Sequence, residues 1–443
     1  MPCQYRCAFD QRDDLKQRHR IQQGSVRRRR HSHMTTDYEP NLLDPELMAN
    51  PRAGFARMRE FAPVCLGKSA MGSPVWYVTG AAEVRTVLSD PRFVTRIQPA
   101  PGEEDTLLKN LAAIGVRGEL TTYVTGMLIN FSGAEHARLR NLVSSAFTAR
   151  RVANFRPRIE EITKALLDEV EAAGSGPVDL IDKFAYPLPI AVICELVGVH
   201  ESDRPAWREW GDGLVSMTAE RTPAALEGMV GQVKELVAKR RAEPADDLVS
   251  ALLRAQADDG DRLSDDELIT LVINIVFAGH ETTAHLIGNA TAALLTHPDQ
   301  LELLRKEPER WPTAVHEFLR LWTPFPVSPL RYATETLELG GRTINAGEAV
   351  LAILLSANTD PNEHSCPERF DVTRREGKRS AGNFGFGHGV HYCLGAPLGR
   401  LEAEVGLSAL FQRFPDLALE GEPSWTPHPL MIRLPKLAVS LGR

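Results

Sequence analysis

One cysteine lies in a glycine-rich loop that a helix-forming segment follows at once. The loop reads Phe384-Gly-Phe-Gly-His-Gly-Val-His-Tyr-Cys393-Leu-Gly395, and helix-forming residues run from Ala396 to Phe411. Because glycine tolerates positive φ and close approach to its backbone, such a loop can lie against a flat ligand. A thiolate that directly precedes a helix is stabilised by the partial positive charge of the helix N-terminus. The pattern therefore indicates a sulfur that stays deprotonated on a metal.

Two other interpretations compete for this cysteine. A lone cysteine is most often a small buried apolar residue. Alternatively, two His-x-Cys pairs, His364 with Cys366 and His391 with Cys393, supply four soft ligands, which is an acceptable set for zinc. Zinc requires neither the glycines of the loop nor Phe386, so it is the weaker of the two metal hypotheses.

A second group of unusual residues lies in the middle of a long apolar segment. Ser264 and Glu267 have the spacing of a capping box, which predicts a helix from this point to about Thr296, where His297-Pro298 stops it. About 30 residues at 1.5 Å each give a helix of roughly 45 Å, long enough to cross the molecule. Its apolar residues face nearly all directions before position 278, which predicts burial.

The centre of this predicted helix, Ala278-Gly-His-Glu-Thr-Thr283, contradicts its apolar character. Gly279 weakens a helix, and Glu281 places a carboxylate where burial is expensive. The Thr282 hydroxyl can bond a carbonyl of the preceding turn and bend the helix. Two interpretations are open: a packing notch with an incidental salt bridge, or a groove in which a ligand replaces helix hydrogen bonds.

Both segments resemble motifs of the cytochrome P-450 superfamily. The sequence Phe-Gly-x-Gly-x-His-x-Cys-x-Gly at 386–395 resembles the haem-binding loop, and the hexad at 278–283 resembles the oxygen-activation motif. In this family a cysteine thiolate ligates the haem iron. The resemblance therefore implies that Cys393 is the iron ligand, and that Glu281 and Thr282 deliver protons to dioxygen through water.

The resemblance extends to residues around the haem. His136 and Arg140 have i, i+4 spacing on a predicted helix, which by itself fits a solvated face equally well. In the family, a His and an Arg at these places, and an arginine at the place of Arg331, bind the haem propionates. The usual Asp-Pro-Pro before this helix is replaced by Asn130-Phe-Ser-Gly133, which puts the helix entry in question. The implied cofactor contacts are His136, Arg140, Ala278, Gly279, Arg331, Phe386, Gly387, His391, Leu394 and Gly395.

A Glu-x-x-Arg pair, Glu317 and Arg320, is predicted to lie on a helix. Alone the pair means little, because such spacing is common on surfaces. It resembles the family's Glu-x-x-Arg, which forms a structural ion-pair core with a later arginine, here Arg369.

The wall of a substrate pocket is implied by family position alone. It comprises Asn274, Phe277, Val327, Met431 and residues of the 95–126 segment, whose Gly, Pro and Thr content predicts a loop over the pocket. Asn274 is polar on an apolar helix, so it is equally well interpreted as a substrate hydrogen-bond partner or as a core asparagine bonded to the backbone.

Composition narrows the class of protein. The chain has 443 residues, of which 43% are hydrophobic, which is ample for a large core. A net charge of −7 argues against general nucleic-acid binding. The six cysteines show no paired spacing, as expected in a reducing cytosol. No run reaches the roughly 18 apolar residues of a membrane span. Together with the resemblance, this predicts a cytoplasmic bacterial protein without a membrane anchor.

The implied fold is mainly α with small β-sheets (α+β). It is the triangular prism of the family, with haem b between a long distal helix and a proximal cysteine loop, and residues 34–443 are expected to form one domain. Residues 1–33 hold nine Lys or Arg against three Asp. We expect them to be a disordered basic extension or a mis-assigned start.

The implied activity is that of a haem-thiolate monooxygenase. It would insert one oxygen atom from O2 into a C–H or C=C bond of a small hydrophobic substrate, of the polyketide or macrolide kind. No flavin or iron–sulfur segment is visible, so electrons from NAD(P)H would arrive through a ferredoxin reductase and a ferredoxin, and the protein is expected to be a monomer. The alternatives are a peroxide-driven or non-hydroxylating haem-thiolate enzyme and a non-enzymatic haem-binding protein. The intact Glu281–Thr282 pair favours the monooxygenase.

Overall fold

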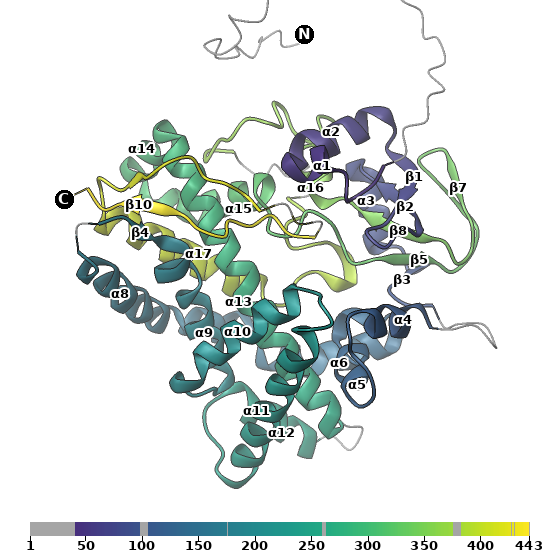
Figure 1. Ribbon diagram of the computed structural model, residues 1–443, viewed down its shortest axis with the longest axis horizontal. Helices are drawn as coiled ribbons and strands as arrows, with labels where there is room; N and C mark the ends of the chain where they lie inside the picture. Colours follow the sequence, from purple (N-terminus) through teal and green to yellow (C-terminus); the bar gives the residue numbers. More distant parts are fainter. Residues whose placement is uncertain are drawn as a thin grey trace, which may run out of the picture.

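The structure, a computed structural model, describes residues 40–97, 105–174, 176–258, 263–374, 382–426, 428 and 430–442. The expectation for residues 1–33 lies outside this part of the chain. Within it, helices predominate and the strands are short, so the predicted mainly-α fold with small sheets is confirmed. The outline is roughly triangular, with the largest sheet at one corner and helices filling the rest (Figure 1).

The helices follow the chain in this order: α1 Pro45–Ala49, α2 Pro51–Phe61, α3 Ala81–Ser89, α4 Thr106–Ala113, α5 Leu120–Thr125, η1 Leu128–Asn130, α6 Gly133–Ala146, α7 Ala149–Asn154, α8 Arg156–Ala172, η2 Ile181–Ala185, α9 Pro187–Val197, η3 Glu201–Asp203, α10 Arg204–Val215, α11 Thr222–Ala242, α12 Leu248–Asp258, α13 Asp265–Thr296, α14 Pro298–Lys306, η4 Pro308–Arg310, α15 Trp311–Leu321, α16 Leu354–Asn358, η5 Gly389–His391 and α17 Ala396–Arg413.

The strands form three sheets. The largest has the order β1-β2-β8-β5-β3, in which β2 and β8 are parallel and the other pairs antiparallel. The order β4-β10-β9 makes a second sheet, and β6 pairs with β7. The strand bounds are β1 Val64–Lys68, β2 Pro74–Val78, β3 Phe93–Val94, β4 Val178–Asp179, β5 Arg331–Ala333, β6 Leu337–Leu339, β7 Arg342–Ile344, β8 Ala349–Ala352, β9 Ala418–Leu419 and β10 Ala438–Ser440.

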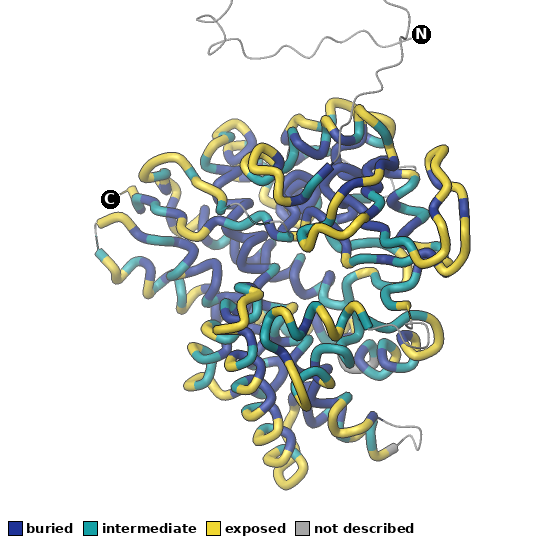
Figure 2. The backbone as a smooth tube through the Cα atoms, turned by 45° about the vertical axis from the view of Figure 1, so that its right-hand side comes forward, coloured by how far each residue is buried: buried dark blue, intermediate teal, exposed yellow. Residues whose placement is uncertain are grey.

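Helix α13 is the central element of the molecule (Figure 1). Its start is the predicted capping box: the Glu267 amide donates to Ser264 Oγ at 3.2 Å, and the Ser264 amide donates to Glu267 Oε2 at 2.7 Å. It ends at Thr296, as predicted, because Pro298 begins the next helix. It packs against α9, α11, α17 and η2, and most of its 32 residues are buried (Figure 2).

Residues 45–61 form two helices, α1 and α2, because the Asn50 side chain caps α2 and Pro51 occupies its first position. One expectation about the first part of the chain was wrong in detail. The segment 95–126 is not simply a loop: α4 and α5 lie within its described residues. Asp105 explains α4, since its carboxylate accepts hydrogen bonds from the amides of Leu107 and Leu108.

In the part of the chain that the structure describes, no helix is long and apolar enough to cross a membrane.

Candidate functional site

The cysteine loop, residues 384–395, folds back on itself before α17. The Cys393 amide donates to the Phe386 carbonyl at 2.9 Å, and the Gly387 amide donates to the Phe384 carbonyl at 2.8 Å. Gly387 and Gly389 have φ of +71° and +70°, which favours glycine. A Cβ at Gly389 would also collide with the Leu88 carbonyl at the end of α3. The loop's glycines are thus required by its turns and by its approach to α3.

The Cys393 sulfur lies at the N-terminus of α17. Burial raises the pKa of its thiol, while hydrogen bonds from the Gly395 and Ala396 amides and the charges of Arg140 and Arg400 act in the opposite direction. These amides and charges are the groups that stabilise a thiolate. The Arg400 guanidinium lies 5.4 Å from the centre of the Phe386 ring. Leu394 packs against the main apolar core.

Four nitrogen-bearing side chains meet next to this loop; we call them the cation cluster. His136 and Arg140 come from α6, Arg331 from β5 and His391 from the cysteine loop. The ring centroids of His136 and His391 are 4.1 Å apart. Nε2 of both histidines and Nε of Arg331 are buried and have no hydrogen-bond partner in the described residues.

Burial lowers the pKa of three members of the cluster, and nearby positive charges lower it further for the two histidines. Burial and the charges of Arg140 and Arg331 lower the pKa of His136. Burial, together with the charges of Arg331, His136 and Arg140, lowers the pKa of His391 to about 3, and burial lowers that of Arg331 to about 10. Within the described ranges no carboxylate pairs with a member of the cluster. Buried cations need anionic partners, so the cluster fits a ligand that carries carboxylates.

The residues present therefore fit a haem. The unpaired nitrogen atoms of the cation cluster would bind its two propionates. The Cys393 sulfur, beside the amides at the start of α17, would bind its iron. The helix that carries His136 begins at Gly133 although the family's Asp-Pro-Pro is absent. Gly133 has φ of +62°, and Ser132 anchors the turn by accepting a hydrogen bond from the Thr95 amide at 3.1 Å.

On α13, three residues form a stripe that the neighbouring elements leave uncovered. Asn274, Ala278 and Thr282 stand at i, i+4 and i+8; Ala278 is exposed and the other two are half-buried. The Thr282 hydroxyl donates to the Ala278 carbonyl at 2.9 Å. We call this the open stripe. Phe277 is half-buried beside it, with its ring edge-on to His280.

Glu281 points to another side of the helix. Its side chain is buried, and Oε1 accepts hydrogen bonds from the Tyr186 hydroxyl at 2.7 Å and from His285 Nε2 at 3.0 Å. Burial alone would raise the pKa of Glu281, but the bonds from His285 and Tyr186 and the charges of His285 and His280 lower it. The carboxylate is thus held ionised beside, not within, the open stripe.

Neither Tyr186 nor His285 emerged from the sequence as a site residue. The i, i+4 spacing of Glu281 and His285 was a usable signal for their contact. Nothing local connects Tyr186, at the junction of η2 and α9, with α13.

Gly279 serves packing between helices. A Cβ at this position would lie 2.8 Å from Ile193 Cγ1 on α9, which is closer than real contacts allow. The packing-notch interpretation of the helix centre therefore describes Gly279. Thr282, in contrast, lies on the open stripe.

The residues expected to line a substrate pocket divide into two pairs. Asn274 and Phe277 lie on or beside the open stripe, whereas Val327 and Met431 are buried. Their two segments are adjacent, because the Ile432 amide donates to the Pro324 carbonyl at 2.8 Å. The side chain of Asn289 joins them to α13 by donating to the Ile432 carbonyl at 2.9 Å.

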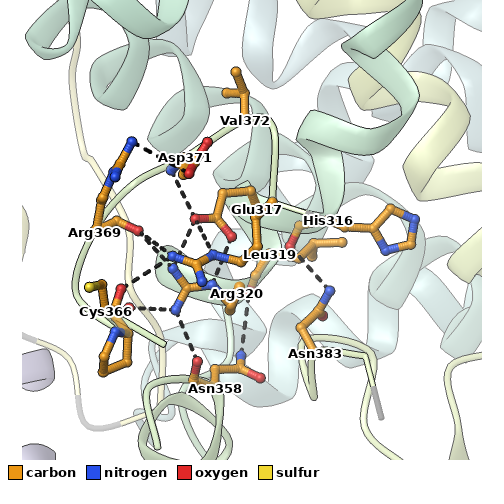
Figure 3. Close-up of polar contacts among 12 residues, drawn as sticks. His316, Glu317, Leu319, Arg320, Asn358, Cys366, Arg369, Asp371, Val372 and Asn383 are labelled. Atoms are coloured by element: carbon orange, nitrogen blue, oxygen red, sulfur yellow. Dashed lines mark hydrogen bonds and ion pairs between the residues drawn. The ribbon is translucent and has the colours of Figure 1, made fainter. Parts of the chain in front are cut away.

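The Glu-x-x-Arg motif forms a buried ion pair, but with a different third arginine from the one predicted. Arg320 Nε lies 2.7 Å from Glu317 Oε2. Figure 3 shows that Arg369 presents its backbone carbonyl to Arg320, at 3.0 Å, while its guanidinium turns toward Asp371. Arg374 is the arginine that pairs with Glu317, at 3.2 Å. The prediction of Arg369 as the pairing arginine was wrong, because the side chain of Arg374 reaches Glu317 while that of Arg369 pairs with Asp371.

The zinc hypothesis gains no support. Among the residues that the structure describes, no group of three or more His, Cys, Asp or Glu side chains could hold a metal ion.

Comparison with known proteins agrees with this geometry. A family model described as Cytochrome P450 matches residues 218–311 and 312–440. Cytochrome P450 107B1 of Saccharopolyspora erythraea is 42% identical over 92% of this chain and 100% of the relative. The 6-deoxyerythronolide B hydroxylase of the same organism is 44% identical over 82% of this chain and 89% of its own.

A solved structure gives the same result for the fold. The tirandamycin C-bound P450 monooxygenase TamI superposes with a TM-score of 0.80 and 36% identity, over 90% of this chain and 99% of TamI. The sequence of the cysteine loop, the cation cluster and these matches agree, and the chain belongs to the cytochrome P450 family.

Proposed function

We propose that this monooxygenase inserts one oxygen atom from O2 into a C–H or C=C bond of a macrolide- or polyketide-like substrate. Haem b would be bound through Cys393, and electrons from NAD(P)H would arrive through a separate ferredoxin reductase and ferredoxin. The observation that carries the proposal is the intact pair on α13, with Thr282 on the open stripe and the buried, hydrogen-bonded Glu281 carboxylate beside it. The relatives support the substrate class, since they include hydroxylases of 6-deoxyerythronolide B and of mycinamicin IV.

A bound haem supplies an iron, made electron-rich by a cysteine thiolate, at which dioxygen is activated. The chain's own residues hold it. Cys393 provides the sulfur, and the amides of Gly395 and Ala396 moderate the thiolate charge. The cation cluster neutralises the propionates, and in return its buried charges obtain partners.

Thr282 and Glu281 are the residues that hold and transfer protons. The Thr282 hydroxyl donates to the Ala278 carbonyl, which leaves its oxygen free to accept a hydrogen bond on the open stripe. Glu281 has one carboxylate oxygen, Oε2, without a partner in the described residues. A proton on this carboxyl can reach Thr282 through water, which is general-acid delivery.

A peroxide-driven enzyme is the alternative that needs the fewest changes. Hydrogen peroxide carries its own protons and electrons, so such an enzyme has no use for an acid–hydroxyl pair. The intact pair therefore favours O2 as the oxidant.

The test uses the holoenzyme with 6-deoxyerythronolide B and tirandamycin C as probes. A substrate of this class should change the haem absorption spectrum on binding. With NADPH, ferredoxin reductase, ferredoxin and ¹⁸O2, it should yield a product that contains one labelled oxygen. No binding by either probe would contradict the substrate class. Faster turnover with hydrogen peroxide than with O2, NADPH and ferredoxin would favour the alternative.

A further inference from the structure

A buried polar cluster lies on the side of α13 away from the open stripe. Glu281, His285 and Tyr186 form its centre, with both protein hydrogen bonds converging on Glu281 Oε1. The side chains of Glu281 and His285 are each only 2% exposed. The Tyr186 and His285 rings meet edge-on at 5.6 Å. The carboxylate and the imidazole are therefore held rigidly against each other.

The two outer atoms of this pair are unpaired. His285 Nδ1 and Glu281 Oε2 are buried and lack a hydrogen-bond partner in the described residues, although the inner atoms, Nε2 and Oε1, are bonded to each other. A purely structural pair would be expected to satisfy its outer atoms, because an unpaired buried polar atom costs about 1–3 kcal/mol. A chain that takes up a proton at one end and releases it at the other requires both ends to be free.

Other ionisable groups face the pair from each packed element. His280, on α13, has Nε2 at 3.9 Å from Glu281 Oε2, and its Nδ1 bonds the Val276 carbonyl. From α10, Asp212 is half-buried, and burial and the charge of Glu281 raise its pKa. Arg208, also on α10, lies over the Tyr186 ring at 4.9 Å and pairs with Asp182 at 2.9 Å. From the C-terminal segment, His428 interacts electrostatically with His285 and Glu281, and Arg433 with Tyr186.

We propose that His285 passes protons to Glu281, and that Tyr186 fixes the carboxylate to receive them. His285 and Tyr186 are thus positioning and relay residues for proton delivery by Glu281 and Thr282. The inference rests on the proposed O2-dependent function, and it adds the route by which Glu281 is recharged.

Each transfer moves one proton and no electrons. A proton taken up at His285 Nδ1 makes an imidazolium. The Nε2–H bond then breaks as a bond forms between the proton and Glu281 Oε1, which leaves a neutral imidazole and a neutral carboxyl. The carboxyl releases its proton toward Thr282 and returns to carboxylate, and the imidazole recovers its starting tautomer by exchange with solvent.

The test variant is His285→Gln, whose amide nitrogen can still donate to Oε1 but cannot carry a proton. The matched control is His297→Gln, at the end of the same helix, where the imidazole bonds the Ala293 carbonyl at 2.8 Å. If His285→Gln does not fold, His285→Asn replaces it, and Glu281→Gln removes the other half of the pair.

The first measurement is the pH dependence of unfolding of the holoprotein, which needs no substrate. The folded pKa of Glu281 is lowered, so its contribution to stability is present above the unfolded carboxyl pKa of about 4.3 and is lost as pH falls below it. In His285→Gln burial dominates and raises that pKa, so the contribution should instead fall as pH rises above about 4.3. His297→Gln should keep the wild-type slope. A loss of stability in His285→Gln that is independent of pH would overturn the pairing.

The second measurement is oxygen consumption and peroxide release with NADPH, ferredoxin and 6-deoxyerythronolide B as the probe. Since a positioned general acid contributes about 10²–10⁴-fold, we expect proton delivery in His285→Gln to slow by roughly tenfold or more. The solvent deuterium isotope effect and the peroxide released per NADPH should both increase. With hydrogen peroxide as oxidant the variant should approach wild type.

Wild-type values of all three quantities in His285→Gln would overturn the relay. If wild-type protein does not oxidise the macrolactone, the substrate proposal fails, while the unfolding experiment still tests the pair.

Discussion

His136 and His391 come from distant parts of the sequence, yet their rings lie 4.1 Å apart, with both Nε2 atoms buried and unpaired in the described residues. Arg140 and Arg331 complete the cluster and carry its positive charge, while burial and that charge keep the two imidazoles neutral. Without a bound anion, the buried charge of this cluster destabilises the folded protein. Binding of an anion removes this destabilisation. The haem-free and haem-bound proteins should therefore respond in opposite directions to removal of one cation.

Arg331→Met tests this relationship. Arg331 is buried on β5 with no carboxylate partner among the described residues, so an apolar side chain of similar length should stabilise the haem-free protein by on the order of 1 kcal/mol. The same change should accelerate loss of haem from the holoprotein. Urea unfolding of the first and haem transfer to a scavenger protein from the second measure the two effects. If both forms are destabilised, Arg331 acts through packing alone.

Arg374→Ala and Arg369→Ala separate the observed ion pair from the predicted one. Arg374 contacts Glu317 and is mostly buried, whereas the Arg369 side chain is 67% exposed. We expect a loss of about 1–3 kcal/mol of unfolding free energy for Arg374→Ala and less than about 0.5 kcal/mol for Arg369→Ala, because its carbonyl remains. Equilibrium unfolding checks both values, and equal losses would contradict the assignment.

The features that could be predicted from the sequence were those set by residues close together in the chain. The bounds of α13 were predictable because Ser264, Glu267 and Pro298 act within one turn of its ends. The cysteine loop was recognisable because its turns demand glycine at fixed positions. Partners set by tertiary structure were not predictable: Arg374 took the place of Arg369 because of the path of a loop, and Tyr186 reaches Glu281 from another helix. Segment 95–126 was predicted as a loop because of its Gly, Pro and Thr content, although Asp105 caps a helix within it.

Gly279→Ala distinguishes a packing notch from a cofactor groove. The new methyl group would press on Ile193, and overpacking of this kind costs about 1–3 kcal/mol. We expect lower stability but an unchanged haem spectrum and unchanged ligand binding. The double variant Gly279→Ala with Ile193→Ala should lose less stability than the two single changes added together. A changed haem spectrum at full stability would show that Gly279 contacts the cofactor.

Glu402→Gln should reveal an unusual pH dependence. Glu402 is buried on α17, both carboxylate oxygens lack partners in the described residues, and burial raises its pKa well above the usual value. A raised folded pKa means that native protein keeps a proton that the unfolded chain releases, so stability declines as pH rises above about 4.3. The variant lacks this decline. Its advantage over wild type should therefore grow with pH, by up to about 1.4 kcal/mol per unit.

Urea unfolding between pH 5 and 8 measures this difference. Glu404→Gln is the control on the same helix, since Glu404 pairs with Arg156 at 2.7 Å near the surface. A constant difference between Glu402→Gln and wild type across this range would mean that Glu402 is ionised in the folded protein.

Thr282→Ala tests the role of the open stripe in oxygen activation. The change removes the hydroxyl that borders the stripe and leaves Glu281 and its partners in place. NADPH oxidation should continue. The product formed per NADPH should fall and the peroxide released should rise, because the hydroxyl that passes on protons from Glu281 is missing. Thr282→Ser should restore coupling.

Thr291→Ala is the matched control for this change. Its hydroxyl makes the same type of bond, to the Ile287 carbonyl at 2.8 Å, but it is buried nine residues farther along α13. Both alanine variants lose one such bond, so any shared effect on stability cancels in the comparison. Coupling should therefore fall only in Thr282→Ala. Equal coupling in the two variants would remove Thr282 from the proton path and leave Glu281 to act through water alone.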